Sequence, residues 1–352
     1  MLLKEPLLSD FPKVCTFQWR SHAEVLLGPV RIDIRSNEPQ FKGLRFFSQF
    51  HAANHGDPER IGTPDFTLNL CNLTIDTPWP LHTLAATHDR NYRARKMSAG
   101  YYLTDHFGAP AYLLSRGTEY WIFAENFEPI LWPYAVKHLL TVYAMKSNLL
   151  HLKAAAIVVD GQGALLVGRG GGGKTVLLTQ LCRAGAEFLS NTHVLLAAES
   201  AGGHRVLGIP TAMRVRPDAV FTPIIAERGL SPSVKAGEYT ADPLRDLGWS
   251  AVSEARVHSI CLLDYQGSRR RTIREMSGDV LFNYMEQFAH AINVYGLKED
   301  ILDALGADVN QFAQEMTRIR THLRSLVEAS RCYYLSCDAA DPRNLREIRA
   351  LL

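Results

Sequence analysis

Residues 1–130 alternate short apolar runs with clusters of Pro, Gly, Asn and Asp. The apolar runs cover residues 30–34, 66–70, 111–114 and 120–123. Runs of this length between turn residues are typical of strands. Residues 132–148 instead carry apolar side chains at helical spacing, which predicts a helix. We therefore expect residues 1–145 to form a strand-rich N-terminal domain.

The pattern changes near residue 146. Apolar runs at 154–159 and 164–167 flank the turn Asp160-Gly161-Gln162-Gly163, which predicts two strands joined by a Gly-rich turn. Further apolar runs predict strands at 188–190, 194–196, 260–264 and 332–335. Helical spacing predicts helices at 279–297, 308–330 and 343–352. We expect residues 146–352 to form an α/β domain with a mixed, twisted sheet and flanking helices.

The second predicted strand of this domain runs into a complete phosphate-binding motif. Residues 168–175 read Gly168-Arg169-Gly170-Gly171-Gly172-Gly173-Lys174-Thr175, which is G-x-x-x-x-G-K-[ST]. The glycines, with Lys174, Thr175 and the first helical residue Val176, can wrap backbone N–H groups around a triphosphate. Lys174 then reaches the β- and γ-phosphates, and the Thr175 hydroxyl binds Mg²⁺. The helix predicted at 176–183 points its N-terminus at the phosphates, and its dipole favours them.

The composition of the chain indicates the class of protein to which this domain belongs. The chain has 352 residues, 47% of them hydrophobic and 21% charged, which is typical of a globular protein. The net charge of +2 argues neither for nor against a nucleic-acid partner. No apolar run reaches the ~20 residues of a membrane span, and the N-terminus lacks the apolar core of a signal peptide.

The six cysteines are scattered, without the spacing of a zinc site or a disulfide framework. Such cysteine usage suits a reducing compartment, so we expect a cytoplasmic protein. We expect no nucleic-acid or membrane partner, and leave open assembly into a homo-oligomer.

Residues 150–155, 160–163, 184–196 and 208–216 extend the motif into a longer pattern. Together with residues 168–175 they resemble the HPr kinase/phosphorylase-like P-loop kinases, in particular the shorter HPr kinase-related proteins found beside peptide and natural-product maturation genes. The resemblance follows the order of elements over about 130–350 and is sharp only between about 150 and 216. It implies a P-loop kinase-like domain that uses ATP, or another nucleoside triphosphate, and Mg²⁺. The implied acceptor is a peptide, an amino acid or a small natural-product intermediate.

The chain departs from this family at its catalytic acids. The family has paired aspartates where this chain has Asn191 and Thr192, and the pair supplies the general base and helps to organise Mg²⁺. Neither Asn nor Thr accepts a proton at neutral pH. His193 follows directly and is our first candidate for the base. Asn191 remains a candidate magnesium ligand beside Thr175, through its carbonyl oxygen.

Four further residues are candidates, and a fifth, Asp264, is weighed against an ordinary turn. The family's strand-opening His falls on Lys153, and His151 lies two residues earlier on the same strand face. Both are alternative catalytic residues. Arg214 and Arg216 alternate along a predicted strand and are candidate phosphate ligands, since arginine pairs well with phosphate. Asp264 ends an apolar run as a magnesium-binding acid would, but we favour an ordinary turn residue there.

The sequence leaves three functions open. The first is a kinase acting on a hydroxyl, amide or guanidine acceptor. The second is a nucleotide-binding pseudo-kinase with a regulatory or scaffolding role, because both family aspartates are absent. The third is an NTPase that couples hydrolysis to a conformational change. Retention of Gly173, Lys174 and Thr175 is expected in all three.

Overall fold

The computed structural model describes residues 18–39, 63–75, 94–97, 100–103, 111–127, 131–200, 202–233, 236–265 and 271–352. The chain divides into two compact units, Met1–Leu139 and Leu140–Leu352. The division falls inside helix α6 (Lys137–Lys146), whereas the sequence places a boundary at the end of that helix. The limits of each independently folding domain therefore stay a prediction.

The described part of the first unit is built on one sheet. Its strand order is β1-β2-β3-β7-β6-β5-β4, with β2–β3 and β3–β7 parallel and the other pairs antiparallel. The strands are β1 (Ser21–Leu27), β2 (Val30–Ser36), β3 (Phe66–Asn72), β4 (Ala94–Met97), β5 (Gly100–Leu103), β6 (Ala111–Arg116) and β7 (Glu119–Ala124). The strands expected in this region are confirmed as β2, β3, β6 and β7.

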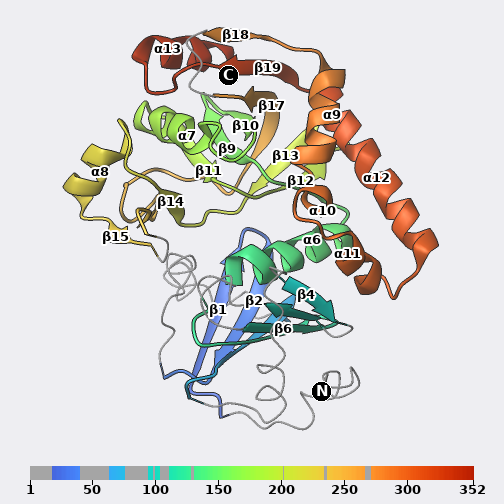
Figure 1. The fold of residues 1–352 in the computed structure, drawn as a ribbon. Coiled ribbons are helices and arrows are strands. Elements are labelled where there is room, and N and C mark those ends of the chain that lie inside the picture. Colours follow the sequence, from blue (N-terminus) through green and yellow to red (C-terminus); the bar gives the residue numbers. More distant parts are fainter. Residues whose placement is uncertain are drawn as a thin grey trace. The chain divides into compact units, whose positions relative to one another are not determined.

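The second unit holds a larger mixed sheet (Figure 1). Its main path is β11-β9-β10-β17-β13-β12-β8, and β19 pairs with both β17 and β18. The strands are β8 (Leu150–Leu152), β9 (Ala155–Val159), β10 (Gln162–Val167), β11 (Glu187–Ser190), β12 (Val194–Ala198), β13 (His204–Gly208), β17 (Glu254–Leu263), β18 (Thr272–Glu275) and β19 (Arg331–Ser336). Strands β10, β17 and β19 run parallel, and the remaining pairs are antiparallel. The expected α/β class with a mixed sheet is confirmed.

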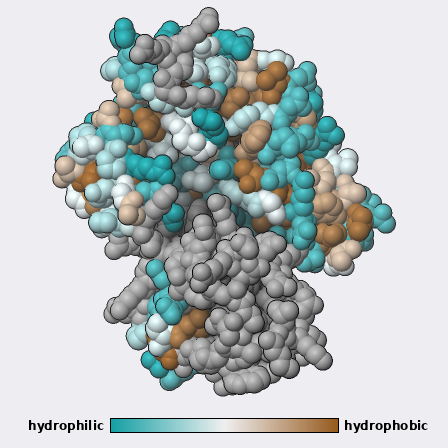
Figure 2. All heavy atoms as spheres, viewed as in Figure 1, coloured by the Kyte–Doolittle hydropathy of each residue, from teal (hydrophilic) through white to brown (hydrophobic). Residues whose placement is uncertain are grey.

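A small sheet and several helices complete the second unit. The small sheet has the order β14 (Met213–Val215), β16 (Tyr239–Ala241), β15 (Ser231–Pro232). The helices are α7 (Lys174–Arg183), α8 (Phe221–Arg228), α9 (Gly278–Phe288), α10 (Ala291–Val294), α11 (Lys298–Ala304), α12 (Val309–Glu328) and α13 (Pro342–Leu351). Helix α7 contacts β9, β10 and β11, and α13 contacts α7. Figure 2 shows the outer face of α12 as largely hydrophilic.

The continuous helix expected at 279–297 is broken into α9 and α10. The chain between them passes through Ala289 and His290, and His290 forms an isolated β-bridge with Leu152. The carbonyl of Ala289 accepts a hydrogen bond from the backbone N–H of Lys153 at 2.7 Å. That carbonyl is therefore unavailable to a continuing helix, and the break joins this segment to the end of β8. No helix in the described ranges is long and apolar enough to cross a membrane.

Candidate nucleotide-binding site

The phosphate loop, residues 168–175, connects β10 to α7 at the edge of the sheet. Strand β10 ends at Val167, and α7 begins at Lys174. Gly168, Gly171 and Gly173 have φ angles of 148°, 78° and 89°, in the region that favours glycine. A Cβ atom on Gly168 would lie 2.3 Å from the carbonyl oxygen of Leu263 on the neighbouring strand β17. The expected strand, loop and helix are therefore present, and β17 packs tightly against the first glycine.

Replacing Gly168 with alanine is expected to destabilise the second unit by about 2–4 kcal/mol, through backbone strain and the clash with Leu263. Gly170→Ala is the matched control, because an added Cβ there meets no atom within 4 Å. We expect the control to change stability by less than about 0.5 kcal/mol. Chemical denaturation of both variants measures the difference. Equal stability of the two variants would contradict this packing of the loop.

Lys174 folds back onto the loop. Its Nζ donates hydrogen bonds to the carbonyl oxygens of Gly168 at 2.8 Å and Arg169 at 2.9 Å. Burial, and to a smaller extent the positive charge of Lys153, together lower the pKa of Lys174 to about 8. Burial also lowers the pKa of Lys153. Two ammonium groups whose charges repel each other favour the binding of a polyanion.

The lowered pKa of Lys174 predicts a pH-dependent affinity for triphosphates. Below about pH 8 this lysine is charged before and after binding, so pH has no effect through it. Above that pH the free protein must take up a proton, because a bound polyanion favours the ammonium form. We expect affinity to fall roughly tenfold between pH 7.5 and pH 9.

Displacement of a fluorescent triphosphate at several pH values measures this dependence. Lys174→Arg is the control, since the guanidinium group does not titrate in this range. Its affinity, whatever its absolute value, is expected to stay level. A fall of the same size in the Arg variant would assign the dependence to another group.

A buried chain of polar side chains lies on the β8–β12 side of the sheet. His151 Nδ1 lies 2.9 Å from Thr141 Oγ1, and His151 Nε2 lies 2.9 Å from His193 Nδ1. The Tyr295 hydroxyl is 3.4 Å from His193 Nδ1. His151 and His193 are only 2% and 1% exposed. In the bond between the two rings one nitrogen donates and the other accepts, so each ring fixes the tautomer of the other.

Lys153 interacts both with this buried group of polar side chains and with the lysine of the phosphate loop. Its Nζ lies 5.9 Å from the centre of the Tyr295 ring, and its charge acts on Lys174. The Tyr295 hydroxyl keeps its proton, because burial raises its pKa well above the ordinary value. The structure thus places His151 and His193 in direct contact, and Lys153 close to Tyr295 and within electrostatic reach of Lys174. These two histidines and two lysines are the four residues that the sequence marks as catalytic candidates. Tyr295 and Thr141 were missed, and no spacing in the sequence signals them.

Asn191 and Thr175 supply the oxygen atoms considered for Mg²⁺. Asn191 is 8% exposed; its Oδ1 accepts a bond from Thr211 Oγ1 at 2.9 Å, and its Nδ2 donates to the Ala212 carbonyl at 3.3 Å. Within the described residues no group of His, Cys, Asp or Glu side chains forms a metal site. Mg²⁺ suits such a sparse set, because it binds with one or two protein oxygens, phosphates and water.

The two arginines lie on and beside the small sheet. Arg214 is exposed on β14. Arg216 donates from Nε at 3.0 Å and from Nη2 at 2.7 Å to Glu238 Oε1, and Glu238 is 6% exposed. The guanidinium group of Arg216 is therefore already paired with a buried carboxylate. Its role as a phosphate ligand stays a prediction that requires this ion pair to open.

Asp264 follows β17 directly, and β17 is the parallel neighbour of β10. The carboxylate of Asp264 accepts a hydrogen bond from the Tyr334 hydroxyl at 3.1 Å, and the Asp264 carbonyl accepts one from Ser336. Because parallel strands β10 and β17 end at the same sheet edge, Asp264 lies on the same edge as the phosphate loop. The choice between a magnesium-binding acid and the ordinary turn residue that we favour from the sequence stays a prediction.

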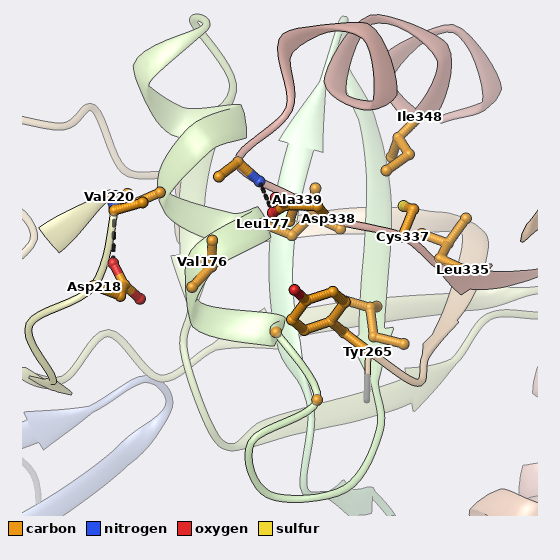
Figure 3. Close-up of a pocket in the computed structure, with 15 residues that line it drawn as sticks. Val176, Leu177, Asp218, Val220, Tyr265, Leu335, Cys337, Asp338, Ala339 and Ile348 are labelled. Carbon is orange, nitrogen blue, oxygen red and sulfur yellow. Dashed lines mark hydrogen bonds between the residues drawn. The ribbon is translucent and has the colours of Figure 1, made fainter. Parts of the chain in front are cut away.

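A cavity of about 210 Å³ opens beside the phosphate loop. Figure 3 shows its walls, which come from α7, from the ends of β17 and β19, and from α13. We call it the side pocket; its lining includes Gly172, Gly173, Val176, Leu263, Leu335 and Ile348. No pattern in the sequence predicts this pocket, since its walls come from segments far apart along the chain.

Comparison with known proteins gives little to add to this geometry. No protein-family model and no curated protein matches the chain. Among solved structures, the HPr(Ser) kinase/phosphatase from Coxiella burnetii is similar to 36% of this chain and 76% of its own, with 19% identity and a TM-score of 0.23. A likeness of this strength identifies no family.

Proposed function

We propose that residues 168–175 bind the phosphates of a nucleoside triphosphate, ATP or another, and that the protein transfers the terminal phosphoryl group to an acceptor. The observation that supports this most is the local geometry of the loop. The loop has backbone angles that favour glycine, and the first turn of α7 carries a lysine. A cavity adjoins the loop at the same place. This arrangement suits a triphosphate better than a neutral ligand.

Each part of the loop has a distinct role in this proposal. Backbone N–H groups and the dipole of α7 bind the phosphate oxygens. Lys174 exchanges its hydrogen bonds to the Gly168 and Arg169 carbonyls for the β- and γ-phosphates. Thr175 and Asn191 would hold Mg²⁺, which neutralises charge on the transferring group. Lys153 adds a second positive charge close to Lys174.

The acceptor is proposed from the sequence resemblance. We propose a hydroxyl of a peptide, an amino acid or a small natural-product intermediate, with amide and guanidine groups as alternatives. His193 is proposed as the proton acceptor, with Lys153 and His151 next. A base bonded to a second buried imidazole is held in one orientation and one tautomer, which supports a base role.

A specific observation also favours the second function, nucleotide binding without transfer. His193 is 1% exposed, and both polar atoms of the Asn191 side chain are hydrogen-bonded within the protein. A side chain so enclosed reaches an acceptor only after a local rearrangement. A regulatory or scaffolding pseudo-kinase, or an NTPase, requires no acceptor base.

One incubation series separates these functions. The protein is incubated with ATP or GTP, Mg²⁺ and candidate peptides or amino acids, with Lys174→Ala as the control. Mass spectrometry detects a gain of one phosphoryl group on the acceptor, and a colorimetric assay detects released phosphate. Phosphorylated acceptor that is absent from the control supports the kinase. Phosphate release alone indicates an NTPase, and binding without either product indicates the pseudo-kinase.

A further inference from the structure

The side pocket is placed and sized for one ring system of a nucleotide. It touches the phosphate loop at Gly172 and Gly173 and the first turns of α7 at Val176 and Leu177. Its volume of about 210 Å³ is below the roughly 300–1,000 Å³ of pockets that enclose a whole drug-sized ligand. A ligand whose phosphates lie in the loop would therefore place only its base there.

The walls of the pocket are suited to the faces of a flat ring. Val176, Val220, Leu335 and Ile348 contribute apolar side chains from four separate elements or loops (Figure 3). Tyr265 adds an aromatic side chain that is 38% exposed. Apolar and aromatic walls favour a heteroaromatic base over a charged or strongly hydrated acceptor.

The polar lining of the pocket is acidic. The side chains of Asp218 and Asp338 both line it, and no Lys, Arg or His is among the described lining residues. Ionised carboxylates only accept hydrogen bonds, so the pocket selects a ligand edge that presents N–H donors. It disfavours an edge that presents lone pairs.

The two carboxylates differ in how far the protein already uses them. Asp218 Oδ1 accepts bonds from the backbone N–H groups of Val220 and Phe221, both at 2.8 Å, where the chain enters α8. Asp338 Oδ1 accepts one bond, from the N–H of Ala340 at 2.9 Å. That bond orients the Asp338 side chain, while its neighbours Cys337 and Ala339 also line the pocket. Asp338 is therefore the carboxylate that is better placed to accept hydrogen bonds from a base.

We propose that the side pocket binds a guanine base and that the Asp338 carboxylate accepts its N1–H and N2–H groups. The assignment rests on the proposed nucleotide site and names its preferred ligand, GTP. Guanine presents these two donors side by side, which matches the two oxygens of a carboxylate. Adenine presents the N1 lone pair beside its amino group, so one carboxylate oxygen would face a lone pair and binding would weaken.

Competition among three triphosphates tests the assignment. GTP, ATP and XTP are titrated against a bound fluorescent triphosphate on the full chain, at constant pH and Mg²⁺. We expect the parent protein to bind GTP about tenfold or more tighter than ATP, the range of charge-assisted hydrogen bonds. Asp338→Asn should reverse the choice between GTP and XTP. The Asn amide donates to the xanthine O2 while its carbonyl still accepts N1–H, but it cannot accept a second donor from guanine.

Asp218→Asn is the matched control. The Asn Oδ1 atom can accept the same two backbone bonds from Val220 and Phe221, so the start of α8 is retained and the order GTP over XTP should stay as in the parent. If ATP binds as tightly as GTP and Asp338→Asn changes no preference, the base assignment is wrong and the nucleotide site stands. If Asp218→Asn produces the switch instead, Asp338 is not the reading residue. If none of the three triphosphates binds, both the assignment and the proposed function are wrong.

Discussion

Lys174→Ala is expected to weaken triphosphate binding about tenfold to a hundredfold, since a charge-assisted hydrogen bond contributes about 1.5–3 kcal/mol. The fold should survive, because the partners of Nζ are the Gly168 and Arg169 carbonyls at the edge of the unit, and Arg169 is exposed. Isothermal titration with ATP or GTP and Mg²⁺ at pH 7 measures the loss. At that pH most of Lys174 carries its charge, as its pKa is about 8.

Lys153→Ala is the matched control for this experiment. Lys153 follows β8 rather than the loop, and it acts on Lys174 through charge. Its removal should weaken triphosphate binding less than the removal of Lys174 does. It should also move the pH at which affinity falls to a higher value, because one cause of the lowered pKa is gone. Unchanged affinity in Lys174→Ala would contradict a nucleotide site at residues 168–175.

The strand, loop and helix of the proposed nucleotide site could be predicted because their requirements are local. Only glycine adopts the backbone angles of Gly168, Gly171 and Gly173 without strain, so the loop conformation can be predicted from residues adjacent in the sequence. The apolar run before the loop and the helical spacing after it need no distant partner to be recognised. The same holds for the strands β2, β3, β6 and β7 in the first unit.

The side pocket could not be predicted, because it depends on the order of strands in the sheet. Strand β17 pairs in parallel with both β10 and β19. This pairing is the reason why Leu263 and Leu335 lie at the same edge of the sheet as the phosphate loop. The break between α9 and α10 has a similar origin, because the Ala289 carbonyl bonds to the backbone of Lys153, more than a hundred residues earlier. Neither contact leaves a periodic signal in the sequence.

The histidine pair could be predicted in part: the sequence marks the two residues, but their contact depends on the fold. The sequence marks His151 and His193 separately, each from its distance to a family motif. Their contact follows from the antiparallel pairing of β8 with β12, in which Leu195 lies opposite His151 and Val194 opposite Leu152. One residue of slip in this register would turn the two rings to opposite faces of the sheet. The pairing thus converts two isolated candidates into one hydrogen-bonded unit.

If the protein transfers a phosphoryl group, His193→Asn is expected to lower turnover about 10²–10⁴-fold, the usual contribution of a positioned general base. An Asn side chain places an amide near the position of Nδ1, so the bond that now joins His193 to His151 Nε2 can be kept. The variant therefore removes basicity with little change in packing. Triphosphate affinity should change by less than about twofold, because the change touches no part of the phosphate loop. Single-turnover kinetics and a binding titration measure the two effects separately.

The pH profile and a complementary variant decide between a base and a structural role. A histidine base makes the rate rise with pH as the imidazole loses its proton, and His193→Asn should abolish that rise. The double substitution Asn191→Asp, Thr192→Asp restores the acid pair of the resembling kinases next to the same strand. If His193→Asn retains the parent turnover, His193 is not the base, and Lys153 and His151 are tested next. If the parent shows no transfer and the double variant gains it, the nucleotide site is complete and the missing group is the proton acceptor. That outcome makes the natural chain a nucleotide-binding pseudo-kinase, because Asn191 and Thr192 then account for the lost transfer by themselves.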